Sequence, residues 1–148
     1  MLPTLVKEPF DSPDWIFETK LDGYRAIAVI DATGKARIWS RNHLPLEPKS
    51  PTVADAINRL NLRPTILDGE IVALDKDGIP RFQLLQQWQK RPTAPVVFFL
   101  FDLLWSGGHD LTGKTVVQRR DRLAHIIVPI SRIQAHLDTQ ERMGGIRK

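Results

Sequence analysis

The 148-residue chain contains no cysteine. Disulfide bonds, thiolate nucleophiles and cysteine-bound metals are therefore excluded, and any metal must be held by oxygen or histidine ligands. The sequence also lacks a run of about 18 apolar residues, the length that a membrane-spanning helix requires. The absence of cysteine agrees with a reducing compartment. We therefore expect a protein of the cytoplasm with no membrane partner.

Internal repeats and long low-complexity tracts are also missing, which excludes solenoids and long linkers. Hydrophobic residues make up 42% of the chain and charged residues 26%, as in a compact domain. Lys and Arg exceed Asp and Glu by 21 to 17, which gives a net charge of +4. This charge is compatible with a polyanionic partner such as nucleic acid, but no arginine-rich run or zinc-finger spacing accompanies it.

Short strand and helix patterns alternate along the chain. The turn residues Asp22-Gly23 predict a hairpin between the first two strands, and a second turn at 31–34 adds a third strand to an antiparallel meander. Strands with interspersed helices predict an α+β fold with mainly antiparallel sheet. We expect strands at 15–20, 24–30, 36–40, 66–74, 96–105 and 132–135, helices from Ser50-Pro51 to Arg63-Pro64, at 82–88 and at 117–127, and a loop at 107–113.

The stretch ETKLDGYRA places two cations around the predicted hairpin turn. A two-residue turn at Asp22-Gly23 would set Lys20 directly opposite Arg25, a pairing of like charges that destabilises a sheet. A phosphate bound between the two cations would neutralise both, with the arginine forking two oxygens while the lysine attacks phosphorus. The neighbouring Arg25 would favour the neutral, nucleophilic amine of Lys20, whereas Glu18, on the same strand face, would favour its charged form. The alternative is a solvated hairpin end.

A second pattern is ILDGEIVALD, in which Asp68 and Glu70 share one face of a strand with apolar neighbours. Buried unpaired carboxylates are costly. Either they meet basic partners, or they hold a hard cation such as magnesium or a ligand hydroxyl. The alternative is an Asp-Gly bulge with Glu70 paired to a neighbouring cation.

A third pattern is the apolar strand VVFFLFDLLW, in which Phe99 and Phe101 lie on one face. Aromatic side chains at such positions commonly belong to the core. The alternative is a ring that stacks on a nucleobase.

Four stretches occur in the order of motifs of the covalent nucleotidyltransferases: KLDGYR, SRN, LDGE and FFLFDLLW. The sequence resembles most the adenylation domain of the bacterial end-joining DNA ligases, where an opening similar to EPFDSPDWIFETKLDGYRA and a later RRDRL helix occur. The resemblance implies an α+β fold of antiparallel sheets and short helices around a nucleotide cleft, the covalent nucleotidyltransferase or ATP-grasp-like ligase fold. It also implies ATP and Mg²⁺ as cofactors.

Residue roles follow from the same resemblance. Lys20 would attack the α-phosphate of ATP, expel pyrophosphate and carry AMP as a phosphoramidate. Phe101 would stack on adenine, Glu70 would bind the ribose or the metal, and Glu18 would lie beside the adenine edge. The implied nucleotide-binding residues are Glu18, Asp22, Gly23, Arg25, Arg41, Glu70 and Phe101, of which the two arginines contact ribose, phosphate or the DNA end.

The implied partner is nicked or broken duplex DNA. In the family, AMP passes from the lysine to the five-prime phosphate of a nick, and the three-prime hydroxyl then displaces it. This is the chemistry of strand sealing in DNA repair and recombination.

The sequence also departs from the family pattern. Relatives continue to a glutamate-glycine motif, a paired-lysine motif and an OB-fold. In this sequence only the residues MGGI at 143–146 could be a degenerate form of the glutamate-glycine motif. We therefore expect a partial adenylation domain at 1–135 and a short tail at 136–148. Two alternatives stay open. The chain could be a catalytically dead remnant that binds nucleotide or DNA, or half of a split ligase that a second chain completes. It could also belong to an RNA ligase or a capping enzyme.

Overall fold

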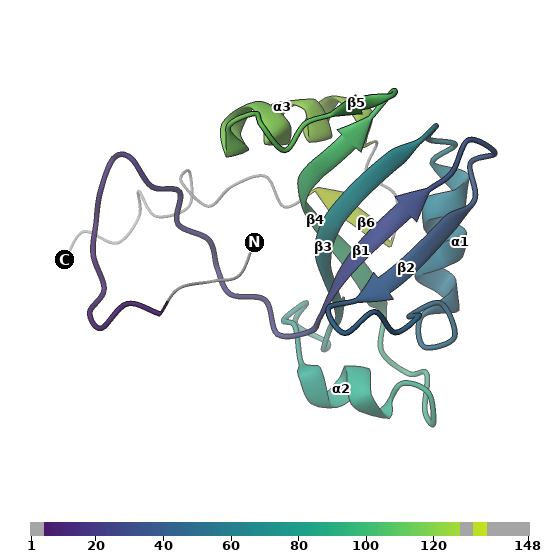
Figure 1. Cartoon of the computed structure of the whole chain (residues 1–148). Coiled ribbons are helices and arrows are strands. Elements are labelled where there is room, and N and C mark those ends of the chain that lie inside the picture. Colours follow the sequence, from purple (N-terminus) through teal and green to yellow (C-terminus); the bar gives the residue numbers. More distant parts are fainter. Residues whose placement is uncertain (1–4, 128–131, 136–148) are drawn as a thin grey trace. The chain divides into compact units, whose positions relative to one another are not determined.

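The computed structural model describes residues 5–127 and 132–135 (Figure 1). They belong to two compact units, one up to Lys20 and the other from Leu21 onward. In the first unit residues 5–20 form no helix or strand. The ring of Phe10 packs edge-on against those of Trp15 and Phe17, with centroids 5.2 Å and 5.6 Å away. The predicted tail at 136–148 lies outside the described residues, and the domain boundary stays a prediction.

The second unit is built on a six-stranded sheet in the order β2-β1-β3-β4-β5, with β6 paired to β4 (Figure 1). Its strand pairs are antiparallel except β4 with β6. The predicted α+β class with mainly antiparallel sheet is therefore confirmed. The elements are β1 (Tyr24–Ile30), β2 (Ala36–Ser40), α1 (Pro51–Arg59), β3 (Thr65–Ala73), α2 (Phe82–Gln87), β4 (Val96–Ser106), β5 (His109–Asp110), α3 (Val116–Ile126) and β6 (Ile133–Ala135).

Local sequence signals account for most of these bounds. The turn between β1 and β2 forms as predicted because Asp31 Oδ1 accepts from the backbone N–H groups of Thr33 and Lys35, at 2.8 Å and 3.1 Å. Helix α1 has Ser50 at its N-cap position and a proline in its first turn, but it ends at Arg59, before the predicted stop. The predicted loop at 107–113 contains the short strand β5.

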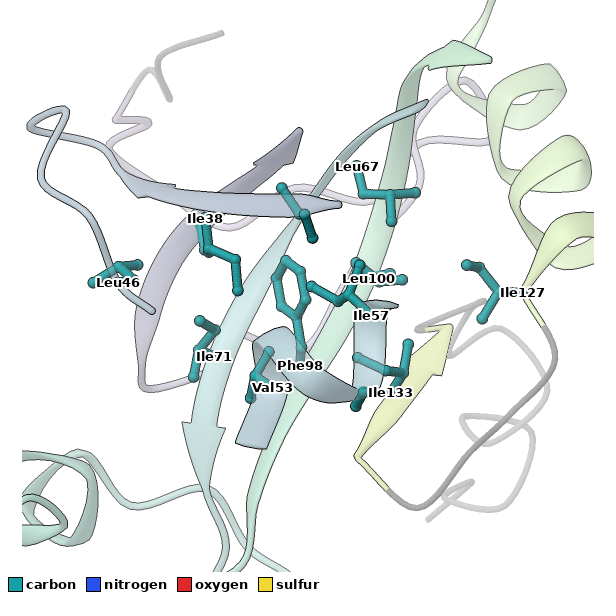
Figure 2. Packing of buried hydrophobic residues seen from close by; sticks show 14 of the residues in the cluster. Ile38, Leu46, Val53, Ile57, Leu67, Ile71, Phe98, Leu100, Ile127 and Ile133 are labelled. Atoms are coloured by element: carbon teal, nitrogen blue, oxygen red, sulfur yellow. The ribbon is translucent and has the colours of Figure 1, made fainter. Parts of the chain in front are cut away.

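The hydrophobic core lies on the face of the sheet against which α1 packs (Figure 2). Alternate residues of β1 and β3 point into it, as the pleat requires. Phe98 of β4 is fully buried near the centre of this cluster, together with Val53 and Ile57 of α1. The alternate positions of β1 and β3 lie on the opposite face of the sheet and include Arg25, Asp68 and Glu70.

The predicted hairpin around Asp22-Gly23 is wrong. No strand forms at 15–20, so the predicted three-strand meander does not exist, and Lys20 does not pair with Arg25. The physical reason is that β1 has both edges occupied, by β2 on one side and β3 on the other. No edge of β1 remains for the preceding segment, and Arg25 is placed opposite Glu70 of β3 instead.

Candidate functional site

One end of the sheet gathers most of the predicted site residues. The register sets Arg25 of β1 opposite Glu70 of β3, and Glu70 opposite Phe99 of β4. Ala26 pairs with Ser40, so Arg41 follows β2 at the same end at which β1 begins. Helix α2 lies at this end as well (Figure 1). Antiparallel pairing thus brings residues from four separate sequence patterns together.

Arg25 is the centre of this group. Its Nε and Nη2 donate to the two carboxylate oxygens of Asp68, at 3.1 Å and 2.7 Å. Its guanidinium carbon also lies 5.2 Å from the centroid of the Phe101 ring, a cation–π distance. The pKa of Arg25 is raised, chiefly by the hydrogen bond to Asp68. Of the two outcomes expected for the buried carboxylates, a basic partner or a cation or ligand hydroxyl, Asp68 has the basic partner.

Glu70 is half-buried, and it forms no ion pair within the described residues. Desolvation is the main cause that raises the pKa of Glu70, and the nearby carboxylates of Asp68 and Asp22 act in the same direction. The charge of Arg25 and a hydrogen bond from the Gly23 N–H oppose the shift without cancelling it. A carboxylate in this state gains by meeting a hydroxyl group or a cation.

The segment Asp22-Gly23 is fixed on both sides. Asp22 Oδ2 accepts from the backbone N–H of Phe82, the first residue of α2, at 3.3 Å. A Cβ atom at Gly23 would lie 2.2 Å from the Ile71 carbonyl oxygen, so only glycine allows this approach to β3. The ring of Tyr24 meets that of Phe82 edge-on at 5.3 Å. These contacts hold the start of β1 against α2 and β3.

The structure adds residues that the predicted site did not contain. Asp68 is one, and Asp102 with Arg119 is another: Arg119 Nε and Nη2 donate to the Asp102 carboxylate at 2.7 Å and 2.8 Å. The hydrogen bond to Asp102 raises the pKa of Arg119. An aspartate inside the apolar stretch FFLFDLLW already required a cationic partner, and the arginines of RRDRL were the signal for it.

The other predicted site residues are exposed. Arg41 is exposed and forms no ion pair among the described residues. Glu18 and Lys20 are exposed residues of the unit that ends at Lys20, so the sheet geometry does not include them. The sheet brings together Asp22, Gly23, Arg25, Glu70 and Phe101, with Arg41 at the same end.

In residues 5–127 and 132–135, no group of three or more His, Asp or Glu side chains could by itself hold a metal ion. Within the same ranges, no helix is long and apolar enough to cross a membrane. Asp68 and Asp102 are paired with arginines, whereas Asp22 and Glu70 form no ion pair in these ranges.

Comparison with known proteins matches residues 3–143 to the family described as ATP dependent DNA ligase domain. The multifunctional non-homologous end joining protein LigD of Pseudomonas aeruginosa is 35% identical over 127 residues, covering 85% of this chain and 15% of that protein. A DNA ligase of Pyrobaculum arsenaticum is 34% identical over 129 residues, covering 80% of this chain and 22% of that protein.

Among solved structures, a mycobacterial DNA ligase D complexed with ATP and MES matches with a TM-score of 0.66 and 32% identity. The match covers 74% of this chain and 35% of that one. The ligase domain of M. tuberculosis LigD matches with the same TM-score and covers 36% of its length. The chain thus spans a minor part of each of these relatives.

Proposed function

Because the chain belongs to the family of ATP-dependent DNA ligase domains, we propose that its sheet binds ATP and that Lys20 takes AMP from it. The observation that carries this proposal is the convergence of Arg25, Glu70 and Phe101 at the end of the sheet where β1 begins. Lys20 is three residues before Gly23, so at most about 11 Å of extended chain separates their Cα atoms.

The residues of this end offer three kinds of contact to a nucleotide. Phe101 is half-buried, so part of its ring remains available to stack on adenine. Glu70 is a half-buried carboxylate that would accept a hydrogen bond from a ribose hydroxyl. Arg25 and Arg41 supply positive charge for phosphate oxygens. Asp22 and Gly23 hold the start of β1 in place.

The reaction is nucleotidyl transfer to an amine. The neutral amine of Lys20 attacks the α-phosphorus, an N–P bond forms, and the bond from the α-phosphorus to the bridging oxygen breaks. Pyrophosphate leaves with the electron pair, and the extra proton on nitrogen passes to solvent. Lys20 must therefore lose its proton before it attacks.

Mg²⁺ is part of the proposal. It usually binds to one or two carboxylates together with substrate phosphates and water. We assign Glu70 to it because Glu70 is half-buried and forms no ion pair with an arginine in the described part of the chain, whereas the Asp22 carboxylate accepts from the Phe82 N–H. When bound, the ion would neutralise charge on the phosphates. Asp68 and Asp102 are already hydrogen-bonded to arginines and are not assigned to the metal.

The proposed acceptor of AMP is the five-prime phosphate at a nick or break in duplex DNA, in the cytoplasm. The names of the similar proteins, a non-homologous end joining protein and DNA ligases, favour DNA over RNA or a messenger-RNA cap. A catalytically dead remnant, or half of a split ligase, would have the same fold, but AMP would not become attached to Lys20.

The test is covalent labelling with ATP that carries a radioactive α-phosphate. Wild type should become labelled, Lys20→Ala should not, and Lys35→Ala, in the exposed turn between β1 and β2, should label like wild type. Peptide mapping by mass spectrometry should place AMP on Lys20. Labelling with GTP would indicate a capping enzyme, and transfer of AMP to nicked RNA instead of nicked DNA would indicate an RNA ligase. AMP on any other lysine would contradict the assignment.

A further inference from the structure

Phe101 sits on an irregularity of the sheet. Asp68 pairs with Asp102 and the next residue, Gly69, pairs with Leu100, so β4 has one residue more than β3 at this point. That extra residue is Phe101. A β-bulge of this kind changes the direction of the side chain and leaves backbone groups of the bulged strand without ladder partners.

Hydrogen bonds from helix α3 and within β4 itself stabilise the strand at the bulge. Arg120 Nε donates to the carbonyl oxygen of Phe101 at 3.2 Å. The N–H of Leu103 donates to Asp102 Oδ1 at 2.8 Å, a side-chain substitute for a ladder bond. Arg119 then binds both oxygens of Asp102, and its Nη1 donates to the carbonyl of Lys114 in the loop before α3.

The other side of the bulge is equally constrained. A Cβ atom at Gly69 would lie 2.2 Å from the Phe99 carbonyl oxygen and 2.7 Å from the Phe98 ring, so β3 and β4 approach closely beside the bulge. Arg119 is only 5% exposed, which leaves little access for water to replace its hydrogen bonds. The backbone at Phe101 is therefore fixed by β3 on one side and by two arginines of α3 on the other.

We infer that Arg119 and Arg120 are positioning residues for the nucleotide site, acting through the bulge on the ring of Phe101. Arg120 holds the carbonyl of Phe101 itself, and Arg119 holds the next residue, Asp102. The inference rests on the proposed function, because it assumes that the ring contacts the base of ATP. It assigns to α3 an effect on nucleotide affinity that is exerted through the backbone of β4.

The test is a double-mutant cycle on ATP affinity. Arg120→Met keeps the side-chain stem and removes the donor, and Phe101→Leu removes the ring. Each single variant should weaken ATP binding by about fivefold or more, the factor that corresponds to losing a stacking contact of about 1 kcal/mol. Arg120→Met should have no further effect in the Phe101→Leu background, because both changes remove the same contact.

Three controls separate positioning from general damage. Arg122→Met changes an exposed arginine of the same helix and should leave ATP affinity unchanged. Arg120→Lys can still donate to the Phe101 carbonyl and should recover part of the affinity. Inorganic tripolyphosphate, which has no base, should bind wild type and Arg120→Met equally.

The outcomes distinguish the inference from the function on which it rests. Wild type that labels on Lys20 while Arg120→Met keeps full ATP affinity would overturn the inference alone. Additive losses in the double variant, or an equal loss of tripolyphosphate binding, would overturn it as well by showing that Arg120 acts elsewhere. Wild type that neither binds ATP nor becomes labelled would overturn the proposed function too.

Discussion

Arg25 and Asp68 form a two-bond ion pair that runs diagonally between β1 and β3, with N–O distances of 3.1 Å and 2.7 Å. The residue directly opposite Arg25 in the register is Glu70, not Asp68. The guanidinium thus binds the more buried carboxylate, and the directly opposed Glu70 is left half-buried with a raised pKa. The two carboxylates of LDGE therefore differ: Asp68 orients the arginine, and Glu70 is the one that we propose to contact a ligand.

The first prediction concerns this pair. Arg25→Met leaves the carboxylate of Asp68, which is only 6% exposed, without its partner. We expect the free energy of unfolding to fall by about 1 to 3 kcal/mol, the cost of an unsatisfied buried polar group. Urea denaturation measures this change. The double variant Arg25→Met with Asp68→Leu, in which both partners become apolar, should regain most of the stability. A double variant no more stable than Arg25→Met would show that the pair is not the cause.

The second prediction is a pH dependence due to Glu70, whose pKa is raised mainly by desolvation. The folded chain keeps the Glu70 proton at pH values where the unfolded chain has lost it. The contribution of this group to stability is therefore greatest below the ordinary glutamate pKa and declines as pH rises toward the raised pKa. Glu70→Gln has no group that titrates there.

Thermal unfolding across this pH window measures the effect. The unfolding temperature of Glu70→Gln should decline less with rising pH than that of wild type. Glu8→Gln, which changes an exposed glutamate of the first unit, should keep the wild-type slope. A wild-type slope in Glu70→Gln would assign the pH dependence to other groups.

The third prediction separates two phenylalanines of β4. Phe101→Leu removes a half-buried ring near Arg25, so ATP affinity should fall by a stacking contribution of about 1 to 3 kcal/mol while most stability is kept. Phe98→Leu leaves a cavity at a fully buried position and should cost about 1 kcal/mol or more of stability. Calorimetric titration with ATP and thermal unfolding measure the two effects. Unchanged ATP affinity with lowered stability in Phe101→Leu would assign that ring to the core.

The fourth prediction concerns Gly23. In Gly23→Ala the new Cβ would meet the Ile71 carbonyl oxygen at 2.2 Å, and a backbone atom cannot move aside as a flexible side chain can. Overpacking of this kind costs about 1 to 3 kcal/mol, and the start of β1 must shift. We expect lower thermal stability together with weaker labelling of Lys20. Gly113→Ala, with nothing within 4 Å of the new Cβ, should change neither, and the prediction fails if the two variants behave alike.

Hydrophobic pattern and turn residues alone predicted most of the elements. The strands at 24–30 and 36–40 match β1 and β2, and the apolar run at 96–105 lies within β4. Such patterns are local, because alternation and turn chemistry depend on residues close in the chain. The strand expected at 15–20 failed because strand formation also requires a free edge, and β3, which follows more than forty residues later, occupies the one beside β1.

The sequence by itself determined the family, through KLDGYR, SRN, LDGE and FFLFDLLW in order, and with it the chemistry proposed for Lys20. Residue types and spacing are sufficient for that, because they are properties of the chain. Tertiary structure alone decided which charges meet: that Arg25 binds Asp68, and that Arg119 reaches Asp102 seventeen residues before it. Ion pairs form between side chains that strand register and helix packing bring within a few ångströms of each other. The order of residues along the chain does not specify the distance between two side chains or how deeply they are buried.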